Sequence, residues 1–298
     1  MTSLTWLPPN NGDPVIFSRD SADYKLLRAY TGFAEIPSDH IYAEKAPMRH
    51  GKKRKYSVLK ERPVSFDIQI LSDNLDDLQD KVSTLSAAMN PLEGPGVLKY
   101  TKENGSEYHL NCIGVAGNPA LDKEDRSQTN QKATIQLIAD EDPFWHAGSP
   151  TIVSFDATPA PMFPWTLPWT IAPSTAAQIC TNDGSTEAPV IVVFKGPLVN
   201  PSLTCVHTVG GFDYTETISF TITLAAGDIL IVNTDPDIKT ARYYPAAGGD
   251  NNAHKYMDPP PAKLWQLPRG ISTVRFNNLT SSTGSGATME YTPRFVGV

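Results

Sequence analysis

Two short acidic clusters are the first residues whose type could bind a metal ion. Asp140, Glu141 and Asp142 are consecutive, and Asp122, Glu124 and Asp125 precede them. Carboxylate oxygens bind hard cations, but a calcium ion takes about six to eight oxygen ligands. We favour the alternative of solvated loops, because neither cluster supplies that many oxygens. The six histidines show no pair at ligand spacing, so we predict no metal and no cofactor.

Positive charge is concentrated in residues 49–55, which contain five cations: Arg49, Lys52, Lys53, Arg54 and Lys55. Such a run can contact phosphate or the acidic surface of a partner. The alternative is a solvated hairpin loop. The whole chain has a formal charge of −7, which argues against a general nucleic-acid-binding protein.

No motif of a common enzyme class is present. Gly94-Pro95-Gly96 lacks the third glycine of a dinucleotide-binding turn, and Gly284-Ser285-Gly286 is too short for a nucleophile elbow. A glycoside hydrolase needs two carboxylates at a defined separation, and the sequence identifies no such pair. The sequence therefore predicts a protein that is not an enzyme.

The chain has three widely spaced cysteines: Cys112, Cys180 and Cys205. An odd number predicts free, partly buried thiols and folding in a reducing cytoplasm. Trp145, Trp165 and Trp169 either form a platform on which a sugar stacks or pack between domains. Their proline-rich context favours packing, and Trp265 beside Leu264 is expected in a core.

Length and composition favour two β-rich domains. The 298 residues include 26 prolines and 20 glycines, and a domain has a typical length of ~150 residues. Prolines break helix interiors, so a mainly helical protein is excluded. Residues 1–15 show no signal peptide, and no apolar run approaches the ~20 residues of a membrane span. We expect no membrane association.

In the first half, residues 64–70 alternate between apolar and polar side chains, which predicts a strand with one buried face. Apolar residues then recur at spacings of three and four, at Leu75, Leu78, Val82, Leu85 and Met89. This stripe predicts an amphipathic helix within residues 74–90, capped by Asp73 or Asn74 and ended by Asn90-Pro91. Other strands are expected at residues 15–17, 24–30, 97–101, 107–112 and 133–137. The polar residues 116–130 are expected to form a loop.

Seven prolines lie in residues 143–173 and predict a stiff linker over residues 146–180. This linker separates a first domain, residues 1–145, from a second domain, residues 181–298. The second domain shows short strand patterns and no helix pattern, at residues 190–194, 217–224, 229–232, 273–276 and 288–292. Their spacing indicates an antiparallel sandwich. Residues 235–261 give no prediction of fold.

The order of motifs resembles the siphovirus distal tail proteins, which form a ring at the tip of long non-contractile phage tails. Asn90-Pro91 and a glycine turn before Leu98-Lys99-Tyr100 follow the strand and helix in the family's order, "NP…G.L.Y". Asp142-Pro143-Phe144-Trp145 is similar to the family's "A..DPFW" close of the first domain. Similar matches in the second half are Asn182-Asp183-Gly184-Ser185-Thr186, Ala188-Pro189-Val190, Gly196-Pro197, Asn200-Pro201, Gly227-Asp228, residues 264–270 and residues 290–295.

The resemblance implies a mainly β protein. Its first domain would be a β-sandwich or split barrel with one helix, and its second a galectin-like antiparallel β-sandwich. It also implies a structural virion protein whose homo-hexameric ring connects the tail tube protein to tail-associated and receptor-binding proteins. Such a protein is assembled in the host cytoplasm and located at the tail tip. In that setting residues 49–55 are a candidate subunit or tube contact.

A carbohydrate-binding module is the alternative function. The galectin-like resemblance and three tyrosines expected to be exposed, Tyr243, Tyr244 and Tyr256, motivate it. The ligand would be a host cell-surface glycan. A galectin-like architecture need not carry galectin function, so the two hypotheses stay open at this point.

Overall fold

The computed structural model describes residues 2–9, 12–43, 53–115, 118–156, 176–260, 262–277 and 285–298. The chain forms two compact units. The first unit comprises Met1–Gly148 and Phe295–Val298, and the second comprises Ser149–Arg294. Across the described residues the fold is mainly β with one α-helix, as the sequence predicts.

The bounds of the units differ from the predicted domain bounds at two places. Strands occupy both ends of the predicted linker 146–180, and residues 157–175 between them lie outside the described residues. Phe295–Val298 belong to the first unit rather than to the second. The second unit is thus an insertion between two segments of the first.

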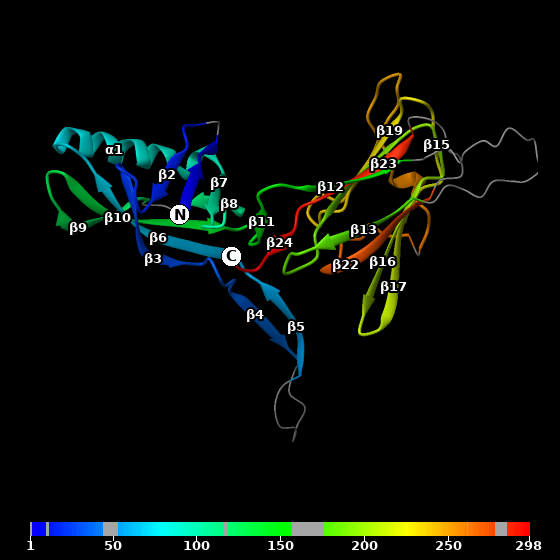
Figure 1. Cartoon of the computed structure of the whole chain (residues 1–298), viewed down its shortest axis with the longest axis horizontal. Coiled ribbons are helices and arrows are strands. Elements are labelled where there is room, and N and C mark those ends of the chain that lie inside the picture. The colour runs from blue at the N-terminus through cyan, green and yellow to red at the C-terminus, as the bar shows by residue number, and fades with distance from the viewer. Residues whose placement is uncertain are drawn as a thin grey trace, which may run out of the picture. The chain divides into compact units, whose positions relative to one another are not determined.

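The first unit is built around one sheet of ten strands with the order β24-β11-β8-β7-β1-β2-β3-β6-β10-β9. A further pairing between β8 and β10 closes part of this sheet into a barrel (Figure 1). The strands of the sheet are β1 (Ser3–Leu7), β2 (Val15–Ser18), β3 (Tyr24–Thr31), β6 (Arg62–Leu71), β7 (Gly96–Thr101), β8 (Glu107–Gly114), β9 (Ala120–Arg126), β10 (Asn130–Ala139), β11 (Trp145–Ala147) and β24 (Arg294–Phe295).

Strict alternation builds the central pair of this sheet. In β6 every second residue from Arg62 to Ile70 is buried, and β10 is antiparallel to it over ten residue pairs. Ile68 and Ile135 are completely buried, while the residues between the buried positions lie on the other face. The predicted strand at residues 64–70 is therefore confirmed and extends over Arg62–Leu71.

The predicted helix is α1 (Leu75–Ala88). Asn74 is the N-cap, since its side chain accepts a hydrogen bond from the backbone N–H of Asp77 at 2.9 Å. Leu78 and Leu85 are buried in the core of the first unit. The Trp6 indole N–H donates to the carbonyl of Ala88 at 2.7 Å and joins the end of the helix to β1. A 3₁₀ turn, η2 (Pro91–Glu93), follows.

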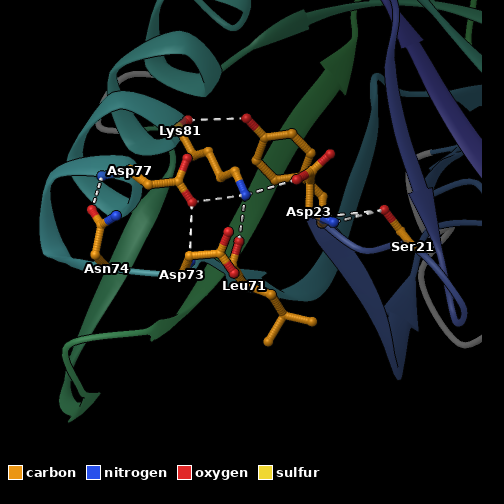
Figure 2. Close-up of polar contacts among 8 residues, drawn as sticks. Ser21, Asp23, Leu71, Asp73, Asn74, Asp77 and Lys81 are labelled. Atoms are coloured by element: carbon orange, nitrogen blue, oxygen red, sulfur yellow. Dashed lines mark hydrogen bonds and ion pairs between the residues drawn. The ribbon is translucent and has the colours of Figure 1, made fainter.

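Lys81 joins the middle of α1 to the sheet (Figure 2). Its ammonium lies 2.7 Å from Asp23 and 3.1 Å from Asp77, and it donates to the carbonyl of Leu71 at 2.9 Å. Tyr24 donates its hydroxyl proton to the carbonyl of Lys81. The hydrogen bond to Asp23 raises the pKa of Lys81, which keeps this cation charged at neutral pH.

Arg62 closes the first unit. Its side chain is fully buried and donates to the carbonyls of Pro143, Gly32, Phe33 and Val296. Burial lowers the pKa of this guanidinium to about 10, so it remains charged at neutral pH. Val296 is one of the four last residues, and the N–H of Val298 donates to the carbonyl of Phe33. The last residues therefore form hydrogen bonds with the buried part of the first unit.

The second unit contains a six-stranded sheet, β12-β23-β14-β19-β20-β21, a four-stranded sheet, β13-β22-β16-β17, and the short pair β15-β18. Neighbouring strands in these sheets are antiparallel to each other throughout. The strands are β12 (Thr151–Asp156), β13 (Ala176–Asn182), β14 (Val190–Lys195), β15 (Leu198–Val199), β16 (Ser202–Val209), β17 (Phe212–Ser219), β18 (Thr223–Leu224), β19 (Ile229–Asn233), β20 (Thr240–Tyr244), β21 (Asn251–Asn252), β22 (Gly270–Asn277) and β23 (Gly286–Tyr291).

The core of the second unit consists of inward-facing side chains from both large sheets. Phe194 of β14 and Phe276 of β22 are fully buried, with ring centroids 6.1 Å apart. Trp265 is also buried and donates its indole N–H to the carbonyl of Leu203. Side chains that bridge the two sheets in this way form the core of a β-sandwich, as the sequence predicts.

A buried carboxylate organises one turn of the second unit. Asp228 accepts hydrogen bonds from the N–H groups of Ala225 and Ala246 and from the Tyr243 hydroxyl, all within 2.8 Å. Gly227 precedes it with a φ of +87°, a conformation that a side chain would strain. The three donors lower the pKa of Asp228, the N–H of Ala246 contributing most.

Two expectations about secondary structure are wrong. Residues 116–130 do not form a loop throughout, because β9 (Ala120–Arg126) pairs with β10 as an edge strand despite its charged composition. Residues 217–224 are not one strand. The chain turns at Phe220, whose ring is buried, and the backbone N–H of Thr221 donates to the carbonyl of Tyr256 rather than to a sheet neighbour.

Residues 235–261, for which the sequence gives no fold, contain β20, β21 and a 3₁₀ turn, η3 (His254–Tyr256). In the described part of the chain, no helix is both long and apolar enough to cross a membrane.

Candidate functional site

A two-stranded ribbon extends from the first unit and is the most exposed element that the structure describes. Its strands, β4 (Ser38–Tyr42) and β5 (Arg54–Leu59), are antiparallel and form a sheet of their own. All their residues are exposed. We call these two strands, together with Lys53, the arm. Figure 1 shows the arm projecting away from the barrel of the first unit.

The arm presents apolar side chains without a core beneath them. Its exposed large residues are Ile41, Tyr42, Tyr56, Val58 and Leu59, of which Tyr56 has 54% of its surface exposed. Ile41 and Tyr56 lie directly opposite each other across the strand pair. An isolated two-stranded ribbon is only marginally stable in water, and exposed apolar clusters mark interaction surfaces. The arm therefore presents an exposed apolar surface of the kind at which proteins interact.

Few polar contacts hold the arm together. His40 and Ser57 share a hydrogen bond of 2.8 Å between their side chains, and Lys60 lies 2.9 Å from Asp39 at the base. The hydrogen bond to Asp39 raises the pKa of Lys60. These contacts are solvent-exposed, and exposed ion pairs contribute at most about 1 kcal/mol.

Three of the five basic residues predicted from the sequence lie at the far end of this arm. Lys53, Arg54 and Lys55 are exposed at the start of β5, and none pairs with a carboxylate among the described residues. Arg49 and Lys52 lie outside the described residues. The sequence identified the charged part of the arm but missed its apolar part, whose residues are separated by 11 positions of chain between β4 and β5.

The acidic clusters do not form a metal site in the described residues, where no group of three or more histidines, cysteines or carboxylates has suitable geometry. Asp142 instead lies 3.0 Å from His146 and accepts a hydrogen bond from the N–H of Phe144. Asp140 accepts from the N–H of Glu141. These carboxylates organise the turn that precedes β11.

The three cysteines are free and buried. Burial raises the pKa of Cys180 to about 11 and of Cys205 to about 12, and it raises the pKa of Cys112 further. Thiols with such pKa values remain protonated and are poor nucleophiles and metal ligands at neutral pH. The prediction of free, buried thiols is confirmed.

The aromatic residues considered for sugar stacking do not form an exposed platform in the described structure. Trp145 is fully buried and packs against Phe33, with ring centroids 5.3 Å apart, whereas Trp165 and Trp169 lie outside the described residues. The expectation of exposed tyrosines is wrong. Tyr243 and Tyr256 are half-buried against the core of the second unit, because neighbouring strands and η3 cover them, and Tyr244 is half-buried as well.

A second apolar tip was missed by the sequence analysis. The hairpin β16–β17 ends in Gly210-Gly211 and exposes Val209, Phe212 and Tyr214 around this turn. A glycine pair between two strand patterns is a hairpin signal that could have located it. Its base is anchored, because Leu203 and Ile218 are fully buried.

The arm lies within a segment that matches a known domain. Residues 20–139 match the family model of the phage tail protein RIFT-related domain. The first unit therefore contains a segment that is similar to this phage tail domain. This domain includes α1, the arm and most strands of the barrel described above.

Solved structures extend the likeness beyond the phage tail domain. The chain is similar to SPP1 Dit (gp 19.1), described as a paradigm of the hub adsorption apparatus in phages that infect Gram-positive bacteria, with a TM-score of 0.64 and 11% identity, covering 99% of both chains. It also matches a chain of the phage P2 baseplate in its activated conformation with Ca, at a TM-score of 0.48 and 11% identity, covering 100% of this chain and 99% of that one. A comparison with curated protein sequences finds no significant match.

The predicted resemblance to the siphovirus distal tail proteins is confirmed by these findings. At 11% identity, the likeness to SPP1 Dit shows a shared fold along the whole chain.

Proposed function

We propose that this protein is a non-catalytic structural component of the phage tail tip, in which identical copies join through the arm into a closed ring. The ring connects the tail tube to the proteins that contact the host. The observation that carries the proposal is the arm, an exposed ribbon within the phage tail domain.

Physical reasons favour self-association through this element. The arm exposes five large apolar side chains in a unit whose other apolar strand residues are mostly buried. A contact between two different surface patches on identical copies forms a ring when the rotation between the copies closes. Six copies is the number that the resemblance to distal tail proteins implies.

The remaining features are consistent with a structural role. The cysteines are buried, and no cluster suitable for a metal occurs among the described residues. The virion tail is the location that the phage tail domain supports, and assembly in the host cytoplasm is part of the proposal. The tail tube protein, tail-associated proteins and receptor-binding proteins are the partners we propose.

Sugar binding is not proposed, because the tyrosines that motivated it contribute to packing. Tyr243 donates its hydroxyl proton to Asp228 and is half-buried against the core of the second unit. Titration with host wall saccharide remains a useful check, and binding at micromolar concentration would restore this second function.

The proposal is tested by the mass of the assembly and by its location. We expect multi-angle light scattering of the full chain at tens of micromolar to give a multiple of 32.5 kDa. Negative-stain images should show rings, and antibodies against the chain should label the tail tip of intact virions. A monomer at that concentration, together with unlabelled tails, would contradict the proposal.

The arm is tested by a variant that removes its apolar contacts. Ile41→Ser with Tyr56→Ser should leave the monomer folded and prevent ring formation. The matched control is Phe212→Ser, which changes an even more exposed aromatic residue on the second unit and should leave the mass of the assembly unchanged.

A further inference from the structure

A groove in the first unit is the surface best suited to receive the arm. It has a volume of about 630 Å³ and lies between α1 and the segment that joins β1 to β2. Its walls mix apolar and polar side chains, with Pro8, Pro14, Ile16, Tyr24 and Ala87 among the apolar lining residues. This volume is in the range of protein clefts that bind a ligand or a partner's side chains.

The charge of the groove is opposite to that of the arm. Three carboxylates line it, Asp13, Asp23 and Glu93, and no lysine or arginine does so among the described lining residues. Asp23 is already paired with Lys81 (Figure 2), which leaves Asp13 and Glu93 as exposed charges at the two sides. The arm carries Lys53, Arg54 and Lys55 at its end, all exposed.

Within one chain the arm and the groove lie on different sides of the first unit. Figure 1 draws α1 and β2 on one side of the barrel and the arm projecting from the other. An arm that projects away from its own groove reaches the groove of a neighbouring copy instead. Two different patches on opposite sides of one subunit are what a head-to-tail ring contact requires.

We propose that the groove between α1 and the β1–β2 segment binds the basic end of the arm of a second copy of this chain. Lys53, Arg54 and Lys55 approach Asp13 and Glu93, and the neighbouring apolar residues, Tyr56 foremost, contact the proline-lined wall. The inference rests on the proposed self-association and names the surface that receives the arm.

The walls of the groove are preorganised for this contact. Lys81 fixes Asp23 and the middle of α1, and Tyr24 donates its hydroxyl to the carbonyl of Lys81. Asn74 caps the start of the same helix. Since these groups are already held in place, little conformational entropy is lost when a partner binds.

Charge reversal provides the first test. We expect Asp13→Lys with Glu93→Lys to weaken ring assembly of the full chain at least about tenfold, because two attractive contacts per interface become repulsive. Lys53→Glu with Lys55→Glu should weaken it to a similar extent. Mixing the two variants should restore rings in which the two chains alternate, because both kinds of contact between unlike chains then pair opposite charges. Combining all four changes in one chain should also restore rings.

The matched controls reverse charges elsewhere. Glu103→Lys changes an exposed carboxylate of the first unit outside the groove, and Lys195→Glu changes an exposed lysine of the second unit. Both should assemble like the unchanged chain. Equal weakening by Glu103→Lys would show a general charge effect and would overturn the inference.

Cross-linking provides an independent test. The three native cysteines are buried, so an introduced surface cysteine is readily distinguished from them. Thr84→Cys places a thiol in the groove and Tyr56→Cys places one on the arm. An oxidised mixture of the two single variants should contain disulfide-linked dimers of one chain of each kind, whereas Glu103→Cys with Tyr56→Cys should not.

The two proposals fail in different ways. If the unchanged chain stays monomeric, the proposed self-association is wrong. A second outcome would contradict this inference alone. The unchanged chain forms rings, Lys53→Glu with Lys55→Glu weakens them, and Asp13→Lys with Glu93→Lys does not. If no Thr84–Tyr56 cross-link forms either, the arm binds another surface. Rings that respond to both reversals and give the cross-link support it.

Discussion

A buried charged side chain connects chain segments in each unit, and these two charges have opposite sign: Arg62 in the first unit and Asp228 in the second. In the first unit, the Arg62 guanidinium donates to four backbone carbonyls. In the second unit, the Asp228 carboxylate accepts from two backbone N–H groups and from Tyr243. Both side chains therefore form hydrogen bonds with backbone C=O or N–H groups of irregular segments, which have no partner in a β-sheet.

The difference lies in what each charge connects. Arg62 joins residues that are far apart in sequence, including Gly32, Pro143 and Val296, whereas Asp228 joins the two ends of a short stretch between Ala225 and Ala246. A substitution of Arg62 removes the contacts among all of these distant segments at once. A substitution of Asp228 removes contacts within one turn only. We therefore expect unequal consequences.

The largest effect is expected for Arg62→Met. Four carbonyls lose their donor in a buried position, and we expect the free energy of unfolding of the first unit to fall by about 3–5 kcal/mol. Unit-resolved hydrogen exchange under increasing denaturant measures this loss. The second unit should keep its stability, and the exposed Arg19→Met is the matched control. If the free energy of unfolding falls equally in both units, Arg62 does not stabilise the first unit selectively.

A smaller effect is expected for Asp228→Asn. The amide retains one acceptor oxygen but turns an N–H group towards one of the three donors, so the second unit should lose about 1–3 kcal/mol. Calorimetry with hydrogen exchange of peptides 225–246 measures it. Asp237→Asn, an exposed residue of the same unit, should have no effect. A loss above that of Arg62→Met would reverse the proposed ranking.

Acid should weaken the two units in different pH ranges. Burial, with a smaller contribution from Lys99, lowers the pKa of His109 in the first unit below its ordinary value of 6.5. The unfolded chain then binds a proton that the folded unit does not, so the first unit loses stability as pH falls below about 6.5.

In the second unit the corresponding loss comes at lower pH. The folded pKa of Asp228 lies below its ordinary value of 3.8, so its contribution is present above that pH and is lost as pH falls through the folded pKa. Hydrogen exchange between pH 7 and pH 3 should therefore detect the first unit weakening earlier. His109→Gln should remove the loss of stability of the first unit that begins below about pH 6.5. If the first unit of that variant still weakens before the second, the assignment to His109 is wrong.

The smallest effect on stability is expected in the arm. Tyr56→Ser removes an aromatic ring that is half exposed and belongs to no core, so the free energy of unfolding of the monomer should change by no more than about 0.5 kcal/mol. Chemical denaturation at a concentration below assembly measures it. If the free energy of unfolding falls by several kcal/mol, the arm stabilises its own unit, as Arg62 does, and the expected difference between the two residues is wrong.

Local patterns predicted the regular elements of both units. The spacing of Leu78 and Leu85 located α1, and the alternation around Ile68 located β6, because periodicity reports directly on burial. The edge strand β9 was missed because its charged residues have little strand preference and only pairing with β10 makes them extended.

The contacts between distant elements were much harder to predict from the sequence. Nothing in the sequence around Arg62 indicates that its acceptors come from Gly32, Pro143 and Val296, since no local pattern brings these residues together. The arm was located through its basic residues alone. Its apolar face is formed by Ile41 and Tyr56, which become neighbours only when β4 and β5 pair.

The return of the last residues to the first unit has a consequence for the order of synthesis. On the ribosome, Arg62 emerges long before Val296, so the buried guanidinium lacks one of its acceptors while all of the second unit is being made. The first unit is completed only after the inserted unit has been translated. Because the arm and the groove belong to the first unit, we expect the unit that carries them to reach its final fold only at the end of synthesis.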